Sequence, residues 1–351
     1  MPSRLDRPIG IVGAGAIVNA AHLPAYRKAG FNVVAITDLD RQAAARTAAA
    51  FEIPRVCDSV DELLAMSDVE IVDVAVTPFA QADIALAAIS SGKHLLCQKP
   101  FSESLEAAQR LVEAADAAGT KLAVNQQMRW DQVIRCTRLL LDRGWYGELT
   151  SGTFDIDILT DWASWPWMAN RPGLEYFYHS VHYFDSIRFL FGEPHSVVAS
   201  TARYPAQSAT GETRTFTILD YSDTCKVAVL TNHNNWSPRP HAVMRCQGTD
   251  GQSEGTLGAL YDYPYGRPDT FEFWSRTAAP DHAFSRLFTE RWIPDAFVGP
   301  MADLQRSIEE GREPLTSGRD NLGTLRIILA AYRSSQEGRR LAVSGLKEAT
   351  A

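Results

Sequence analysis

The stretch IGIVGAGAIVNAAH, residues 9–22, decides the first half of the fold. It places a short apolar, β-prone run directly before Gly13 and Gly15, and a helical segment directly after them. In that context, a glycine-rich turn allows backbone N–H groups and a helix N-terminus to meet a pyrophosphate. Val18 stands where the fingerprint for dinucleotide binding has its third glycine, which predicts a looser or differently tilted helix. The stretch therefore predicts the first strand, turn and helix of a nucleotide-binding domain.

Short apolar runs alternate with Ala-rich helical segments on the C-terminal side of this stretch. Such alternation is typical of parallel strands joined by crossover helices. Gly92 and Gly119 close two of the helical segments. We therefore predict a doubly wound α/β Rossmann domain over residues 1–122. Its predicted strands are 9–12, 32–37, 71–76, 94–97 and 121–124.

The pattern changes after a predicted amphipathic helix at residues 131–144. Longer β-rich runs follow, and most of them lack helical crossovers, which favours a mainly antiparallel sheet. We expect residues 123–351 to form an α+β domain with this sheet, and the C-terminal helical tail could pack back on the first domain. The predicted strands lie within 148–159, 196–204, 213–222, 226–235 and 241–248.

Composition narrows the class of protein. The 351 residues are 45% hydrophobic and 22% charged, which is typical of a globular protein. No run is long and apolar enough to predict a membrane span, and the first residues lack the apolar region of a secretory signal, so we expect a cytoplasmic protein. The formal charge of −8, without a basic run, argues against nucleic acid as a partner. Five scattered cysteines predict neither disulfides nor a zinc knuckle.

An acidic residue ends the second predicted strand and indicates which nucleotide binds. Asp38 follows Gly13 by 25 residues, near the spacing at which a carboxylate accepts hydrogen bonds from an adenosine ribose. Because Asp38 would repel a 2′-phosphate, NAD is favoured over NADP. Arg41 keeps NADP possible, since a guanidinium can accommodate that phosphate.

A lysine stands at the carboxyl end of a late strand. In GKHLLCQKPFS, residues 92–102, an apolar run leads into Lys99, and Pro100 favours an extended backbone before it. Ligands of open α/β sheets bind at this edge. Lys99 could hydrogen-bond a substrate hydroxyl and stabilise the negative oxygen as hydride leaves. The alternative is an ordinary surface lysine at a strand end.

The combination of these segments resembles the Gfo/Idh/MocA oxidoreductase family over almost the whole chain. The matching segments are GIVGAGAIVNAAHLPAY, VVAITDLDRQAAARTAAAF, VDVAVTPFAQADIALAAISSGKHLLCQKP, NQQMRWDQVIRCTRLLLDRGWYGEL, HYFDSIRFLFGEP and EGREPLTSGRDNLGTLRIILAAYRSSQEGRR. The resemblance implies a Rossmann domain with bound NAD or NADP and an open, largely antiparallel sheet used for substrate binding and oligomerisation. It also implies oxidation or reduction of a carbinol in a sugar, a polyol or a derivative.

The resemblance assigns roles by position. Lys99 takes the role of the family's active-site lysine, although Gln98 replaces the usual glutamate. His182 takes the role of the acid/base histidine, and Tyr178 stands where the family has an aspartate. Tyr178 or His179 would then orient His182 in place of that aspartate. The full predicted cofactor set is Gly13, Gly15, Ala16, Ile17, Asp38, Arg41, Thr77, Pro78, Gln81, Gln98, Lys99 and Gln127.

The histidines in EYFYHSVHYFD, residues 175–185, admit three interpretations. As metal ligands, His179, His182 and Asp185 would be spread around a helix, so we predict no metal site. As core residues they would serve packing and hydrogen bonding. As a proton carrier, His182 would face a cleft from a helix over residues 177–191 whose apolar stripe points elsewhere. Lys99 and the nucleotide site favour this third interpretation.

Aromatic and polar side chains before this segment suit a sugar ring, but they would equally suit a core or a subunit interface. The predicted substrate-binding residues are Lys99, Arg129, Trp162, Trp165, Asn170, Arg171, Tyr178 and His182. Two other functions stay open: glycoside cleavage through transient oxidation with retained NAD, and nucleotide-bound regulation without catalysis. By analogy we expect a homodimer or a homotetramer.

Overall fold

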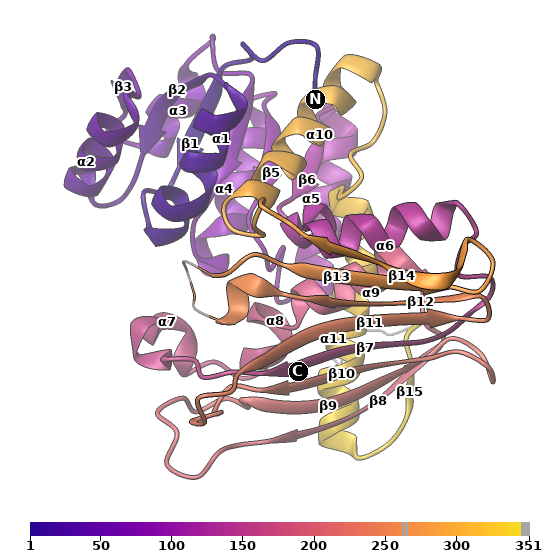
Figure 1. The fold of residues 1–351 in the computed structure, drawn as a ribbon. Coiled ribbons are helices and arrows are strands. Elements are labelled where there is room, and N and C mark those ends of the chain that lie inside the picture. The colour runs from indigo at the N-terminus through magenta and orange to yellow at the C-terminus, as the bar shows by residue number, and fades with distance from the viewer. Residues whose placement is uncertain (262, 264–265, 345–351) are drawn as a thin grey trace. The chain divides into compact units, whose positions relative to one another are not determined.

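The computed structural model describes residues 1–261, 263 and 266–344, which form two compact units (Figure 1). The first unit comprises Met1–Gln127 and Ile293–Leu322, and the second comprises Met128–Trp292 and Gly323–Ala351. The first segment of this unit thus ends at Gln127, whereas the sequence predicted a domain boundary after residue 122. It also includes a late segment of the chain.

The first unit contains a six-stranded sheet in the order β3-β2-β1-β4-β5-β6. All of its neighbouring strands are parallel, which confirms the predicted Rossmann topology. The order reverses between β1 and β4, the switch point at which open sheets bind nucleotides. The strands are β1 (Ile9–Val12), β2 (Val33–Thr37), β3 (Arg55–Val56), β4 (Ile71–Val74), β5 (His94–Cys97) and β6 (Leu122–Val124).

Side chains cap the N-termini of three helices of the first unit. Asp40, Ser59 and Ser104 each accept a hydrogen bond from a backbone N–H of the first turn. Gly119 ends α5 in the left-handed conformation, with a φ of 67°. The helices are α1 (Leu23–Ala29), α2 (Arg41–Phe51), α3 (Val60–Ala65), α4 (Pro78–Ser90), α5 (Leu105–Ala118), η5 (Asp295–Phe297) and α10 (Val298–Glu310).

The helix after the glycine-rich turn starts with a wider turn than an α-helix. Residues Val18–His22 form a π-helix, η1, that leads directly into α1. Val18, in the place of the third glycine, is fully buried. Its isopropyl group occupies space that a glycine would leave to a neighbouring element, and the wider turn accompanies it.

The second unit contains a nine-stranded sheet in the order β14-β13-β12-β11-β7-β10-β9-β8-β15. Among the described strands of this second sheet, β7 and β10 alone pair in parallel, which confirms a mainly antiparallel sheet. The strands are β7 (Leu149–Asp157), β8 (Ser196–Ala202), β9 (Arg214–Asp220), β10 (Lys226–Asn232), β11 (His241–Gly248), β12 (Gly251–Thr256), β13 (Thr270–Ser275), β14 (Ala279–Leu287) and β15 (Leu341–Ala342).

Side chains of the large sheet alternate between a buried and an exposed face. Helices α6, α9 and α11 lie against one face in Figure 1. On β9, for example, Phe216 and Ile218 are exposed while Thr215, Thr217 and Leu219 are buried. The helices of this unit are η2 (Gln127–Trp130), α6 (Gln132–Asp142), η3 (Trp162–Ser164), α7 (Pro166–Ala169), α8 (Leu174–Tyr178), α9 (Val181–Phe191), η4 (Gly258–Tyr261) and α11 (Gly318–Glu337), of which η2 and α11 each begin within the first unit.

The prediction of one continuous helix over residues 177–191 is wrong. The chain forms α8 and α9, with a break at His179 and Ser180. The N–H groups of both residues donate to the carbonyl of Glu175, and the Ser180 hydroxyl donates to the Glu175 carboxylate over 2.6 Å. His179 leaves the helical range with a φ of −121°, and the N–H of Ser180 bonds the carbonyl five residues back instead of four, so the α-helix ends here.

Candidate cofactor and catalytic sites

The turn after β1 has the shape of a phosphate cradle. Gly13 has a φ of +113°, and a Cβ atom there would lie 2.4 Å from the carbonyl oxygen of Ala75. Gly15 has open space around it and is exposed. Only glycine fits the first position, and the second leaves the backbone accessible to a ligand. Ala16 and Ile17 follow at the exposed and half-buried start of the helix.

Asp38 follows β2 and is held by the neighbouring turn. Its Oδ2 accepts a hydrogen bond from the N–H of Ala14 over 2.7 Å, and its Oδ1 accepts one from the N–H of Asp40 over 2.8 Å. Each carboxylate oxygen can accept a further bond, so both remain available to ribose hydroxyls. Arg41 forms an exposed ion pair with Asp58 over 2.7 Å, which directs its guanidinium toward another carboxylate.

The buried side-chain amide of Gln81 fixes the loop that carries Lys99. Gln81, on α4, donates hydrogen bonds from Nε2 to the carbonyls of Gln98, Pro100 and Phe101, over 2.9 to 3.1 Å. The N–H of Lys99 donates to Oε1 of Gln98 over 2.8 Å. Lys99 itself is half-buried at the carboxyl edge of the sheet. Gln81 and Gln98, both predicted to bind the cofactor, therefore also fix the backbone around Lys99.

A buried polar network, which the sequence analysis missed, lies behind Gln98. His22 donates from Nδ1 to Oδ2 of Asp73 over 2.7 Å, and its Nε2 accepts from Nε2 of Gln98 over 2.8 Å. Tyr26 also donates to Asp73 over 2.7 Å, and burial, with the charge of Asp73, raises the pKa of this phenol well above its usual value. A glutamate in place of Gln98 would need a proton on His22 to make the same contact. The amide of Gln98 can thus donate where a glutamate carboxylate could only accept.

These residues fit a bound dinucleotide. The fit rests on the glycine that no larger residue can replace, the open backbone at Gly15 and the carboxylate of Asp38 at the end of β2. Thr77 and Pro78 begin α4 at the same edge, and Gln127 follows β6. When bound, NAD would supply the two-electron acceptor or donor for hydride.

In the second unit, His182 lies in the first turn of α9 and is 6% exposed. Its ring packs edge-on against Trp292, with centroids 5.1 Å apart. Tyr178, at the end of α8, is also buried and packs edge-on against Trp167 at 5.5 Å. The break between the two helices thus separates the predicted acid/base from the residue that stands in place of the family's aspartate.

His179 lies close to a histidine that is distant in sequence. The ring centroids of His179 and His233 are 4.3 Å apart, and the ring of Trp162 lies 5.2 Å from that of His233. His233 follows β10 directly, and Glu175 lies 2.6 Å from its ring. No pattern in the sequence indicated that Glu175 and His233 would lie together. Only the tertiary fold brings them together.

The predicted substrate residues are placed in different surroundings. Arg129 is buried and donates two hydrogen bonds to Asp185, each over 2.7 Å. Trp162 is buried, whereas Trp165 and Arg171 are half-buried and Asn170 is exposed. Their role in substrate binding stays a prediction, and Arg129 already has a structural partner on α9.

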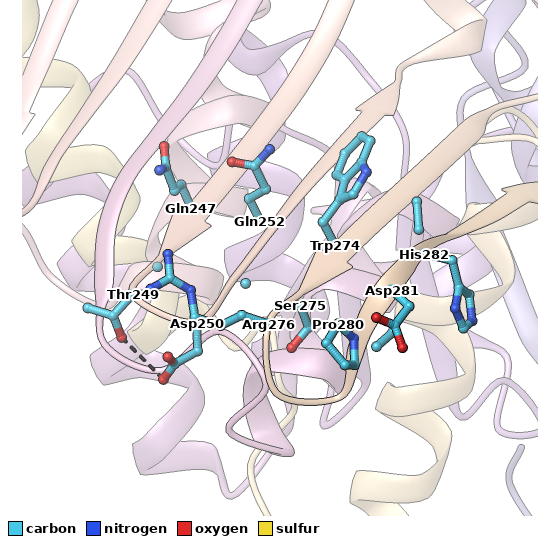
Figure 2. Close-up of a pocket in the computed structure, with 14 residues that line it drawn as sticks. Gln247, Thr249, Asp250, Gln252, Trp274, Ser275, Arg276, Pro280, Asp281 and His282 are labelled. Carbon is cyan, nitrogen blue, oxygen red and sulfur yellow. Dashed lines mark hydrogen bonds between the residues drawn. The ribbon is translucent and has the colours of Figure 1, made fainter.

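The pocket shown in Figure 2 lies away from these residues. It is lined by the turns between β11 and β12 and between β13 and β14, including Gln252, Trp274 and His282. The strand register pairs this end of β11 with the start of β7, whereas His233 follows the strand that pairs with the end of β7. The pocket and the Glu175–His233 pair thus lie at opposite ends of the sheet.

Among the described helices, none combines the length and the apolar character that crossing a membrane requires.

Comparison with known proteins identifies the family. The profile described as "Oxidoreductase family, NAD-binding Rossmann fold" matches residues 7–126, and the one described as "Oxidoreductase family, C-terminal alpha/beta domain" matches residues 160–343. D-apiose dehydrogenase of Paraburkholderia graminis is 28% identical, over 96% of this chain and 90% of that protein. Inositol 2-dehydrogenase of Rhizobium meliloti is 26% identical, over 95% and 98%.

A crystal structure of an oxidoreductase from Agrobacterium radiobacter, in complex with NAD+, L-tartaric acid and magnesium, has the same fold. Its TM-score is 0.84 at 22% identity, and the match covers 96% of this chain and 98% of that one. The two profiles together span both units, and the glycine turn, Asp38 and Lys99 occupy the carboxyl edge of the first sheet. The chain belongs to the Gfo/Idh/MocA family of NAD-binding oxidoreductases.

Proposed function

We propose that this protein is an NAD-dependent dehydrogenase that moves a hydride between the nicotinamide and a carbinol carbon of a sugar, a polyol or a sugar derivative. The observation that carries the proposal is Lys99, which is fixed by Gln81 and Gln98 at the carboxyl edge of a sheet that fits NAD. Relatives named for D-apiose and for inositol support the class of substrate.

Two side chains have separate roles in the proposed reaction. In the oxidative direction the substrate carbon loses its hydrogen with both electrons, and the oxygen loses a proton. Lys99 donates a hydrogen bond to that oxygen and stabilises its negative charge. His182 accepts the proton at a ring nitrogen and returns it in the reductive direction. The contact of His182 with Trp292 holds its ring in one orientation.

Asp38 supports NAD as the preferred cofactor, because a carboxylate next to the ribose repels the 2′-phosphate of NADP. Arg41 forms an ion pair with Asp58, so it favours NADP less than a guanidinium without such a partner would. We also propose that the protein acts in the cytoplasm on small molecules, without nucleic acid or membrane partners. The exposed face of the large sheet would suit a homodimer or a homotetramer.

A substrate screen tests the proposal. Sugars, inositols and sugar acids are offered separately with NAD and with NADP, and the absorbance of the reduced cofactor is followed. We expect reduction of NAD by at least one polyhydroxylated compound, and a lower rate with NADP. Cleavage of a glycoside with no net change in absorbance would instead support transient oxidation. Bound NAD without turnover of any compound would contradict the dehydrogenase assignment.

A further inference from the structure

We propose that Glu175, His179 and His233 form a binding site for one divalent transition-metal ion, of the kind represented by Zn²⁺. The site lies wholly within the second unit and is independent of the redox reaction proposed above. Each residue offers one ligand atom, a ring nitrogen or a carboxylate oxygen, and these atoms all lie within 4.8 Å of one another.

The core of the site is a buried pair of atoms that need a cation or a proton between them. Nε2 of His233 and Oε2 of Glu175 are 2.6 Å apart, and both side chains are fully buried. Among the described residues, neither atom has a hydrogen-bond partner of acceptable geometry. A carboxylate that is buried without compensation costs several kcal/mol. A bound cation would satisfy both lone pairs at once.

Hydrogen bonds on the opposite atoms orient the ligands. Nδ1 of His233 lies 2.8 Å from the Thr160 hydroxyl, and Oε1 of Glu175 accepts from the Ser180 hydroxyl over 2.6 Å. Nδ1 of His179 lies 3.4 Å from the Tyr183 hydroxyl. Ligating histidines typically donate their second ring N–H in this way, which fixes the tautomer. Thr160 therefore leaves the Nε2 lone pair of His233 directed at Glu175.

The fold explains why these segments meet. β7 and β10 run in parallel with Asp157 opposite Asn232, so Thr160 and His233 emerge side by side from the same end of the sheet. The N–H of Thr160 donates to the carbonyl of His233 over 3.1 Å. The break between α8 and α9 then presents Glu175 and His179 as a pair from one turn. The site is thus built on strand ends and a helix terminus, with Trp162 packed against it.

The donor set selects the class of metal. Two imidazoles and one carboxylate suit Zn²⁺ and its neighbours Co²⁺ and Ni²⁺, whereas Mg²⁺ prefers six oxygen ligands. Ligands about 2.0 to 2.2 Å from a tetrahedral zinc lie roughly 3.5 Å from one another, so shifts of about 1 Å complete the site. Three protein ligands leave a fourth position, and His179 is only half-buried. A water molecule or a ligand oxygen would fill that position.

Metal analysis of the whole chain tests the proposal. The protein is prepared without a histidine tag and dialysed against EDTA, then titrated with ZnCl2 by calorimetry and checked by elemental analysis. We expect one Zn²⁺ per chain. His233→Ala and Glu175→Gln should weaken binding by more than about 100-fold, and Thr160→Val by about 10- to 100-fold, because it removes the bond that orients His233. The Co²⁺-loaded protein should show the visible absorption of a four-coordinate site.

Two controls keep the test decisive. His241→Ala removes a half-exposed histidine that pairs with Asp155 elsewhere on the sheet, and it should leave the affinity for Zn²⁺ unchanged. His179→Gln replaces a proposed ligand that is only half-buried. It tests the site even if His233→Ala and Glu175→Gln do not fold. Equal affinity of wild type, His179→Gln and His233→Ala, or less than one ion per chain, would overturn the site. In that case the buried pair holds a proton. Since the measurement is metal binding, it does not depend on turnover.

Discussion

The two units hold polar side chains at strand ends in different ways. In the first unit, Asp38 and Lys99 follow strands of one parallel sheet. Backbone N–H groups donate to Asp38, and the side-chain amide of Gln81 donates to backbone carbonyls of the loop that carries Lys99. In the second unit, Glu175 and His233 lie on distant segments and are oriented by other side chains. The first unit thus uses bonds between a side chain and a backbone group, whereas the second uses bonds between two side chains, which require both side chains to be placed by the folded unit.

The largest effect that we expect is a loss of stability in the second unit when Arg129 is replaced. Arg129 and Asp185 are both buried, and Thr324 also donates to Asp185 over 2.9 Å. Arg129→Ala leaves the carboxylate buried without its main partner, so we expect the free energy of unfolding to fall by about 3 to 5 kcal/mol. Urea unfolding of both proteins measures this change in free energy. A change below about 1 kcal/mol would show that the pair is not a structural support and would favour the substrate role for Arg129.

The first unit should respond to a change in one local conformation. Gly13→Ala places a Cβ atom 2.4 Å from the carbonyl of Ala75 at a φ of +113°, so we expect a loss of about 3 kcal/mol of stability and no measurable NAD binding. Gly15→Ala is the matched control, since that position is open. It should retain stability and lose only affinity for NAD. Equal stability of the two variants would contradict the predicted strain.

The carboxylate at the end of β2 provides a smaller, more specific test. Asp38→Ser removes the negative charge that we propose to lie next to the ribose, and it keeps a short polar group for the N–H of Ala14. We expect affinity for NAD to fall about 10-fold, which corresponds to about 1.4 kcal/mol, while affinity for NADP rises. Fluorescence titration with both reduced cofactors measures the ratio. An unchanged ratio would indicate that Asp38 does not contact the ribose.

The smallest effect that we expect is on the pH dependence of stability, and it involves two buried carboxyl groups in the second unit. Asp131 caps α6 through the N–H of Val133, and its carboxyl group interacts with that of Asp269. Burial and, next, the charge of Asp269 raise the pKa of Asp131 well above its usual value. Burial raises the pKa of Asp269 to about 6. Because both pKa values are higher in the folded state, the folded chain binds more protons than the unfolded chain, so this pair should lose stability as pH rises from about 4.

Asp131→Asn retains the cap and a donor to Asp269 but removes one titrating group. We expect a flatter dependence of unfolding free energy on pH and a gain of about 1 kcal/mol at pH 8. Urea unfolding at pH 5 and at pH 8 measures the difference. An unchanged slope would show that the two carboxyls do not share a proton.

The same contrast explains what could be predicted from the sequence. The glycine turn, Asp38 and Lys99 lie at fixed positions relative to strands, and each strand could be recognised from a short apolar run. The continuous helix over residues 177–191 was wrong because the apolar periodicity does not reveal that Ser180 bonds Glu175. His233 and the network around His22 were missed because their partners lie far away in the sequence. Side chains that depend on tertiary partners leave no local pattern.

The central proposal is that Lys99 and His182 serve one redox step. The most direct measurement is a double-mutant cycle on kcat/KM with Lys99→Ala, His182→Ala and the double variant, each first shown to fold and to bind NAD. Groups that act as a unit are strongly non-additive. We predict that each single change lowers kcat/KM by about 100-fold or more and that the double variant is hardly slower than either. A rate close to wild type for either single variant, or effects that multiply, would contradict the claim.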